Sequence, residues 1–222
     1  MNRTALCALL AAGLAGCAHS TRPDTSQIDT SGAMFHYCSK GWLADTPSRR
    51  VAVTCTHSNP SAGITVTFGA QAISRKVIRT YPVRVPITPD GSVPTDFSRV
   101  IFEHFFAGDV TVLVLDEAVP QGIRAYQLAA SVKDGEWVMP LDQNHVTGTA
   151  QINLHGSDLM ATLRNKSHAP IGGDSGLPWF NARNEVVSHW TAGATGYGPV
   201  YSNPLMSGVL RATLNEAEAS TK

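Results

Sequence analysis

Short runs of β-branched and aromatic residues, separated by turns rich in proline and glycine, recur along most of this chain. The clearest are Gly63–Gly69, in which apolar and polar residues alternate, and Asp109–Leu115, which is a largely apolar run. Alternation with a period of two indicates a strand with one buried face, and a short apolar run between turns indicates a strand buried on both faces. Such strands bury their side chains against other strands, so we predict an all-β sandwich or barrel.

Seven further segments meet the same criteria, and one segment does not. Residues from Leu205 to about Glu218 are rich in leucine, alanine and glutamate, a composition typical of a helix. Pro120 and Gly122 mark a crossing between two halves, which we place at residues 34–120 and 121–222. The other predicted strands are Arg50–Cys55, Val77–Val85, Trp137–Pro140, Val146–Leu154, Leu159–Leu163, Glu185–Trp190 and Pro199–Tyr201.

The charge balance and the motifs exclude several classes of partner. The chain has 222 residues, of which 17 are Lys or Arg and 17 are Asp or Glu. This balance gives no electrostatic reason to expect nucleic acid or an anionic lipid surface as a partner. The sequence has no glycine-rich phosphate loop and no His/Cys cluster with metal-ligand spacing. We therefore expect no cofactor, no metal ion and no nucleic acid, and a monomer.

The beginning of the chain is typical of an export signal. Arg3 precedes the apolar run Ala5–Leu14, which is too short to span a bilayer permanently. The run ends in Leu14-Ala15-Gly16-Cys17, which resembles the lipobox of bacterial lipoproteins. The resemblance implies a signal peptide at residues 1–16, a lipid on Cys17, and anchoring in the bacterial cell envelope, at the outer membrane or periplasmic face of a Gram-negative cell. An ordinary secretory signal with an incidental cysteine is the alternative.

Export also bears on the segment that follows and on the cysteines. Residues 17–33 are polar and are predicted to form a flexible tether. Cys7 leaves with the signal and Cys17 carries the lipid, so Cys38 and Cys55 remain in the folded part. Two cysteines in an exported domain predict one disulfide. Two free, buried thiols are the alternative.

The segment Gly172-Gly173-Asp174-Ser175-Gly176-Leu177-Pro178 carries the strongest chemical signal. A serine between glycines on a tight bend can expose its hydroxyl, and the N–H groups around it can point at one spot. An oxyanion formed in acyl transfer needs that geometry. A glycine-rich turn with no chemical role is the alternative. A serine hydroxyl becomes a strong nucleophile only when a neighbouring base takes its proton.

Gly-Asp-Ser-Gly-x-Pro resembles the nucleophile motif of the chymotrypsin-like serine proteases, and the small bacterial members in particular. The resemblance extends over about residues 35–213. It implies two antiparallel six-stranded β-barrels with a C-terminal helix, catalytic groups in the cleft between the barrels, and Ser175 as the nucleophile. Leu177 replaces the second glycine of the commoner Gly-Gly-Pro ending.

Two other segments resemble the parts of this family that supply the base and its orienting acid. Val53-Thr54-Cys55-Thr56-His57 resembles the histidine segment, although here the cysteine precedes the histidine instead of following it. Gly108-Asp109-Val110-Thr111 resembles the segment with an acid at the head of an apolar strand. The resemblance implies His57 as general base and Asp109 as its partner, with Asp96 and Asp116 as alternatives. The order His57, Asp109, Ser175 is the order of this family.

The resemblance also implies residues that bind the substrate. The backbone N–H groups of Gly173 and Ser175 would form the oxyanion hole. The residue six positions before the serine is an alanine instead of an acid, so an apolar or small side chain is expected in place of Lys or Arg at the cleavage site. An acidic side chain, admitted by His168 and His189, is the alternative. Val187-Ser188-His189-Trp190 resembles the strand that pairs with substrate, with its serine beside the triad. The substrate-binding residues implied in this way are Ala169, Ser188, His189 and Trp190.

These features together predict an exported, lipid-anchored serine endopeptidase that acts on proteins or peptides through an acyl-enzyme. An inactive binding lipoprotein on the same fold is one alternative, favoured by the unusual histidine segment and by Leu177. An esterase with the same triad is another, because a fold does not determine the acyl substrate. In animal members the aspartate that matches Asp174 pairs with a newly freed N-terminus. No activation site is visible here, so the resemblance to bacterial members implies an internal cation instead.

Overall fold

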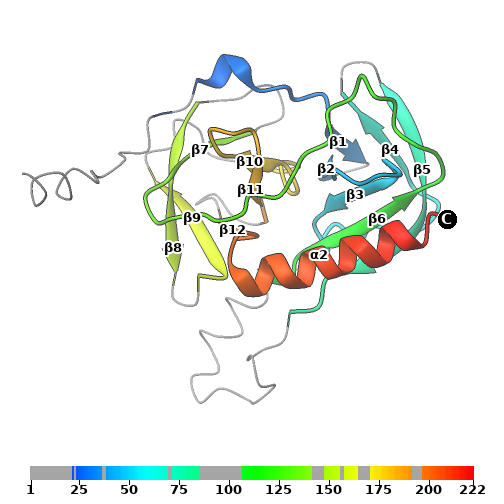
Figure 1. Cartoon of the computed structure of the whole chain (residues 1–222). Coiled ribbons are helices and arrows are strands. Elements are labelled where there is room, and N and C mark those ends of the chain that lie inside the picture. The colour runs from blue at the N-terminus through cyan, green and yellow to red at the C-terminus, as the bar shows by residue number, and fades with distance from the viewer. Residues whose placement is uncertain are drawn as a thin grey trace, which may run out of the picture.

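The structure is a computed structural model that describes residues 22, 24–36, 39–69, 72–85, 107–141, 148–155, 158–164, 171–191 and 197–222. The described residues form two six-stranded sheets and one long helix (Figure 1). The first sheet contains β1 (Ala33–His36), β2 (Ser39–Leu43), β3 (Val51–Thr54), β4 (Thr65–Phe68), β5 (Ile73–Pro82) and β6 (Thr111–Leu115). The second sheet contains β7 (Trp137–Pro140), β8 (Ala150–His155), β9 (Met160–Arg164), β10 (Pro178–Phe180), β11 (Val186–His189) and β12 (Tyr197–Pro199). The helices are a short 3₁₀ helix, η1 (Thr25–Gln27), and the long helix α2 (Pro204–Ala219).

The first sheet closes into an antiparallel barrel with the order β1-β2-β3-β6-β5-β4. β3 and β6 lie next to each other and are buried along their whole length. Ala52 and Leu113 face each other across this pair and point into the barrel, among the side chains of its interior cluster. Val53 and Val112, the next pair, belong instead to the larger core outside the barrel. Both strands therefore read as apolar on both faces, as the sequence predicted for Asp109–Leu115.

The second sheet is antiparallel with the order β11-β10-β7-β8-β9-β12, so each half has the six antiparallel strands that were predicted. Its two end strands, β11 and β12, lie close together but do not pair as strands over the described residues. The Thr191 N–H donates to the Tyr197 carbonyl at 2.9 Å just beyond them. A side chain at Gly198 would lie 2.2 Å from the carbonyl oxygen of His189, so only glycine fits this approach. The described residues thus form one closed barrel and a second six-stranded sheet whose end strands lie close together.

The helix α2 follows the second sheet but lies along the first (Figure 1). Asn203 caps its beginning, since the Oδ1 atom accepts from the N–H of Leu205, and Pro204 occupies the first helical position. Its buried side chains, Met206 and Leu210 among them, join the core that includes the outer faces of β3 and β6. The predicted helix from Leu205 to about Glu218 is confirmed.

Three strands were missed by the sequence analysis. β1 and β2 are rich in residues other than the β-branched type, and β10 is a three-residue strand that follows the serine turn directly. Part of the predicted tether also has a defined place. The Tyr126 hydroxyl donates to the carbonyl of Asp29 at 2.7 Å and accepts from the N–H of Gly32 at 3.1 Å. The chain therefore already contacts the folded body before β1.

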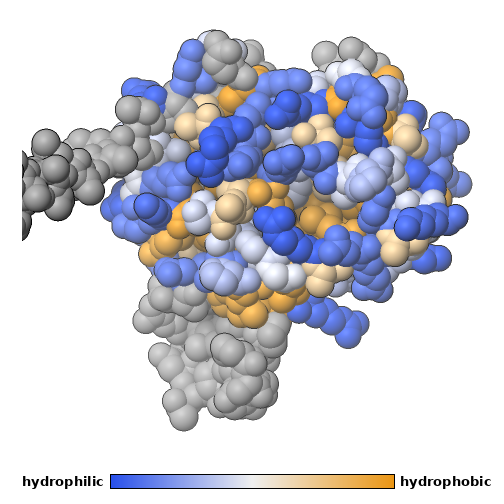
Figure 2. Space-filling model, in the orientation of Figure 1, coloured by the Kyte–Doolittle hydropathy of each residue, from blue (hydrophilic) through white to orange (hydrophobic). Residues whose placement is uncertain are grey.

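The described surface is mostly polar. Hydrophilic residues cover most of the face shown in Figure 2, with apolar residues between them. Among the described residues, three large apolar side chains are clearly exposed, namely Phe35, Ile78 and Ile171. No helix within the described ranges is long and apolar enough to cross a membrane. The predicted signal peptide, the lipidation site Cys17, Cys38 and Asp96 lie outside the described residues.

Candidate active site

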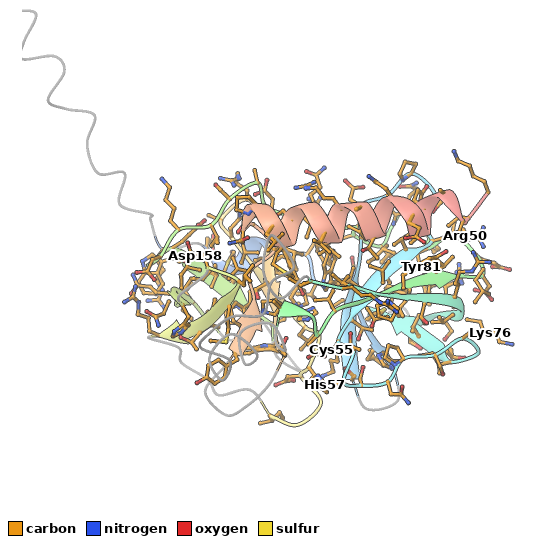
Figure 3. All side chains as sticks on the ribbon, turned by 90° about the horizontal axis from the view of Figure 1, so that it is seen from below. Arg50, Cys55, His57, Lys76, Tyr81 and Asp158 are labelled. Atoms are coloured by element: carbon orange, nitrogen blue, oxygen red, sulfur yellow. The ribbon has the colours of Figure 1, made fainter. Side chains whose placement is uncertain are left out.

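His57 lies in the turn that directly follows β3, at one edge of the barrel (Figure 3). The antiparallel pairing of β3 with β6 aligns Thr54 with Thr111. The chain that leaves β3 therefore runs beside the chain that enters β6. This register brings His57 next to Asp109, as the sequence predicted.

Asp109 holds His57 through two hydrogen bonds. The backbone N–H of His57 donates to Oδ1 at 2.7 Å, and Nδ1 of the ring lies 2.6 Å from Oδ2. The aspartate side chain is 3% exposed and the histidine side chain 39%, so the pair has a buried acid and an accessible ring. Because an ionised carboxylate only accepts, Nδ1 carries the proton and Nε2 is left as an acceptor.

Ser175 approaches this pair from the other sheet. Its Oγ atom lies 3.0 Å from Nε2 of His57, which is hydrogen-bond distance. The carbonyl of Ser175 accepts from the N–H of Lys40 at 2.8 Å and from the hydroxyl of Ser39 at 2.8 Å, both on β2. The N–H of Gly176 donates to the carbonyl of Trp190 at 2.7 Å, beyond β11. The serine turn is thus attached to both sheets.

The hydrogen bond and the charge of Asp109 raise the pKa of His57 above its ordinary value, although partial burial of the ring opposes them. The aspartate thus favours the protonated imidazolium. An imidazole with a raised pKa is a stronger base, so the ring is better able to accept a proton from the serine hydroxyl.

Asp174 lies beside the serine and is almost completely buried. Its Oδ2 atom accepts from the N–H of Ile171 at 2.9 Å, which closes the turn. Its Oδ1 atom lies 3.7 Å from Nζ of Lys40, and the two side chains are 1% and 17% exposed. A buried carboxylate needs a compensating charge, and this lysine supplies one. Lys40 therefore corresponds to the internal cation that the sequence implied but did not identify.

Two glycines give the serine turn its shape. Gly173 and Gly176 have φ values of 94° and 92°, in the region that side chains rarely adopt. A Cβ atom at position 176 would also lie 2.0 Å from the carbonyl oxygen of Lys40. Among the described backbone carbonyls, none accepts a hydrogen bond from the N–H of Gly173 or Ser175.

Three of the four predicted substrate-binding residues are buried. Ser188 and His189 are fully buried, and the Ser188 hydroxyl donates to the carbonyl of Pro199. Both side chains are therefore closed off from solvent. That their strand pairs with substrate backbone, with Ser188 beside the triad, stays a prediction. Trp190 is nearly buried, and its Nε1–H donates to the carbonyl of Leu141 at 2.7 Å. Ala169 lies outside the described residues.

Cys55 is a free thiol in this structure, so the predicted disulfide with Cys38 is not formed. The sulfur atom is fully buried and lies 3.4 Å from the carbonyl oxygen of Trp190. Cys55 directly follows β3, and its sulfur points toward the carbonyl of Trp190, which lies just beyond β11. Burial, with the charge of Asp109, raises the pKa of this thiol well above its ordinary value.

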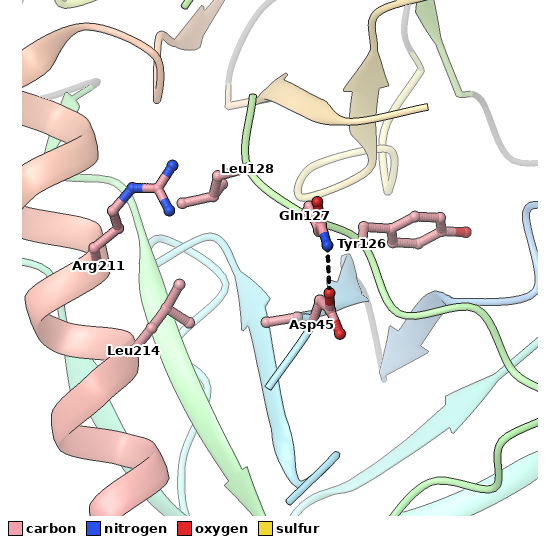
Figure 4. Close-up of a pocket in the computed structure, with 7 residues that line it drawn as sticks. Asp45, Tyr126, Gln127, Leu128, Arg211 and Leu214 are labelled. Carbon is pink, nitrogen blue, oxygen red and sulfur yellow. Dashed lines mark hydrogen bonds between the residues drawn. The ribbon is translucent and has the colours of Figure 1, made fainter. Parts of the chain in front are cut away.

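A separate pocket of about 260 Å³ lies on another part of the surface. Figure 4 shows it between α2 and the segment that joins the two sheets, where Gln127 Nε2 donates to Asp45 Oδ2 at 2.9 Å. None of the three residues His57, Asp109 and Ser175 lines it. The pocket is lined by Ala44, Asp45, Tyr126, Gln127, Leu128, Arg211 and Leu214.

The barrel, the second sheet and the terminal helix together form the chymotrypsin-like serine protease fold. Among solved structures, the chain is similar to kallikrein-related peptidase 10, with a TM-score of 0.60, 15% identity, and coverage of 86% of this chain and 98% of that one. It is also similar to kallikrein-related peptidase 10 in complex with Zn²⁺, with a TM-score of 0.58, 15% identity, and coverage of 91% and 99%. Identity this low shows the fold alone. No known protein family and no curated protein matches the sequence.

Proposed function

We propose that this chain is a serine endopeptidase in which Ser175, His57 and Asp109 form the catalytic triad. The observation that carries the proposal is the continuous chain of contacts from Asp109 Oδ2 to His57 Nδ1 and from His57 Nε2 to Ser175 Oγ, at 2.6 Å and 3.0 Å. Three side chains from distant parts of the sequence meet in the order and tautomer that proton transfer from serine requires.

The proposed reaction has two steps. Ser175 Oγ forms a bond with the peptide carbonyl carbon while its proton passes to Nε2 of His57. The imidazolium, stabilised by Asp109, then gives this proton to the leaving amine as the C–N bond breaks, and an acyl-enzyme results. Water attacks the acyl-enzyme by the same route and gives its proton to Nε2. The imidazolium then returns this proton to Ser175 Oγ as the bond between Oγ and the acyl carbon breaks, which releases the acid and restores the enzyme. The described residues thus supply every proton transfer.

The backbone N–H groups of Gly173 and Ser175 are the proposed oxyanion hole. Their support is that no described backbone carbonyl takes either hydrogen atom, and that the positive φ of Gly173 shapes the turn. A donor of this kind contributes roughly 3 kcal/mol to transition-state stabilisation.

The remaining parts of the proposal rest on the sequence. The lipobox-like segment before Cys17 supports export and a lipid anchor in the bacterial cell envelope, with the polar residues that follow as a tether. The substrate would be a protein or peptide, with Ala169 at the base of its first specificity pocket. Cleavage of a peptide library should therefore favour apolar or small residues, and a dominant preference for Lys or Arg would contradict this assignment.

The proposal is tested with a fluorophosphonate probe, which labels only an activated serine. We expect the purified chain to be labelled, and we expect Ser175→Ala and His57→Ala to abolish labelling. Ser58→Ala is a matched control, because Ser58 follows His57 but donates to the Cys55 carbonyl at 2.8 Å, away from the triad. A folded chain that resists the probe would show an inactive binding protein. Labelling with hydrolysis of esters but not of peptides would show an esterase.

The raised pKa of His57 predicts how activity depends on pH. The base must be neutral to accept the serine proton, so activity should rise with pH through a midpoint above the ordinary histidine value of about 6.5. The effect of His57 on stability has the opposite sign. Its pKa is higher in the folded than in the unfolded protein, so it stabilises the fold at low pH, and this stabilisation is lost as the pH rises through the folded-state pKa. The profile of kcat/KM against pH measures the midpoint in the free enzyme, and a midpoint below 6 would contradict the prediction.

A further inference from the structure

A thiol, an imidazole and a carboxylate converge behind the proposed nucleophile. One possible ligand atom each from Cys55, His57 and Asp109 lies within 4.8 Å of the other two. Cys55 and Asp109 are buried, whereas the ring of His57 is partly exposed and closes the group toward solvent. Figure 3 shows Cys55 and His57 next to each other at the edge of the barrel. Catalysis as proposed uses the histidine and the aspartate but gives the cysteine no role.

Sulfur, nitrogen and oxygen ligands of this kind are those that Zn²⁺ prefers. In a tetrahedral site the metal lies about 2.3 Å from sulfur and about 2.0–2.2 Å from nitrogen and oxygen, so two ligand atoms stand about 3.3–3.6 Å apart. The ligand atoms of these three residues must therefore move by only about 1 Å. Nδ1 and Oδ2, now 2.6 Å apart, must separate, and the sulfur must approach them.

We propose that Cys55, His57 and Asp109 form a binding site for a thiophilic divalent cation such as Zn²⁺, and that occupation of the site inhibits the enzyme. The cation binds the sulfur, Nδ1 of the ring and the carboxylate, and water completes the coordination. Inhibition, but not binding, rests on the proposed protease function.

The protons balance in a way that explains the inhibition. The thiol loses its proton to solvent when the metal–sulfur bond forms, since coordination deprotonates a thiol outright. Nδ1 exchanges its hydrogen for the metal, and the neutral ring then carries its hydrogen on Nε2. That nitrogen faces Ser175 Oγ and can no longer accept a proton from it. The thiolate and carboxylate together cancel the two positive charges of the cation, so no net charge is buried.

A fourth polar side chain lies beside these residues. His189 is fully buried, and neither ring nitrogen meets hydrogen-bond geometry with a described residue. The proposed site is therefore bordered by a further buried imidazole.

The binding test uses the full chain with Ser175→Ala, which cannot turn over substrate but keeps all three ligands. Titration with Co²⁺ should produce a sulfur-to-cobalt charge-transfer band that saturates at one equivalent, and Zn²⁺ should displace the cobalt. Cys55→Ala in the same background should remove the band and weaken Zn²⁺ binding by at least about 100-fold. Absence of the band, or a band that survives Cys55→Ala, would overturn the proposal.

Two controls keep the test specific. Replacing Cys7, Cys17 and Cys38 together by alanine should leave the band intact, because the band is assigned to Cys55 alone. Cys55→Ser should bind Zn²⁺ more weakly than wild type while its thermal unfolding stays cooperative. In the active chain, Zn²⁺ should inhibit peptide cleavage reversibly by chelator, and Cys55→Ala should lose this sensitivity relative to its own metal-free rate. A chain that binds the metal but never cleaves peptides would support the site and refute the protease.

Discussion

Replacing Asp109 by asparagine should lower the turnover of a peptide substrate by roughly 10⁴-fold and leave the fold intact. The amide is nearly the same size, but it is neutral and its NH₂ group donates. Donation to Nδ1 favours the ring tautomer that carries its hydrogen on Nε2, which faces Ser175. The variant also loses the charge that raises the pKa of His57, so this pKa should fall. Steady-state kinetics measure the first effect, and NMR titration of the ring measures the second.

Asp116→Asn is the matched control, because Asp116 lies just after the other end of the same strand. Its carboxylate is exposed and accepts from the N–H of Lys76 at 2.9 Å. This change should alter turnover less than twofold. A loss below tenfold for Asp109→Asn, or an equal loss for the two variants, would remove Asp109 from the proposed triad.

Lys40→Met should cost stability of the order of 3 kcal/mol and reduce probe labelling of Ser175 at least tenfold. The change leaves the Asp174 carboxylate, which is 1% exposed, without the ammonium 3.7 Å away. Breaking a buried ion pair costs about 3–5 kcal/mol, and partial exposure of the lysine places this pair at the lower end. Because Asp174 precedes the nucleophile, relief of its burial must distort the serine turn. Urea unfolding and labelling rates measure the two effects.

Two further variants of this ion pair and one control elsewhere in the barrel separate the effect of the charge from the effect of the side-chain shape. Lys40→Arg keeps the charge and should retain most of the activity, while Lys76→Met removes an exposed lysine of the same barrel and should change neither quantity. Adding Asp174→Asn to Lys40→Met removes the buried carboxylate charge and should recover part of the lost stability. If Lys40→Met alone had unperturbed stability and labelling, the ion pair would have no positioning role.

Local sequence patterns predicted much of the fold. Alternation in Gly63–Gly69 and the apolar run after Asp109 predicted two strands that the structure confirms, because each pattern states which faces are buried. The meeting of His57 with Asp109 was also predictable, since His57 follows β3, Asp109 precedes β6, and these two strands are antiparallel neighbours. No local pattern indicated how the end strands of each sheet meet. Over the described residues the first sheet closes into a barrel, whereas the end strands of the second sheet, β11 and β12, approach each other around Gly198 through long-range contacts.

Other features of the site depend on packing that no local pattern contains. Ser188 and His189 were assigned to a substrate strand, and the sequence did not show that every side chain of β11 is buried. The disulfide was inferred from the number of cysteines, whereas the direction of the Cys55 side chain depends on the packing of the two sheets. Lys40 could not be found at all, because nothing in Ser39-Lys40-Gly41 distinguishes a lysine that pairs with a distant buried aspartate.

The position of α2 has a consequence for how the protein folds as it is synthesised. During translation the barrel strands β3 and β6 emerge long before the helix that covers their outer valines. The nascent barrel must therefore carry an uncovered apolar flank while the second sheet is being made. Only when α2 emerges does Glu218 reach back to accept hydrogen bonds from the Ser48 backbone and hydroxyl. The proposed protease would thus complete its fold late in synthesis, and that flank offers chaperones a place to bind until then.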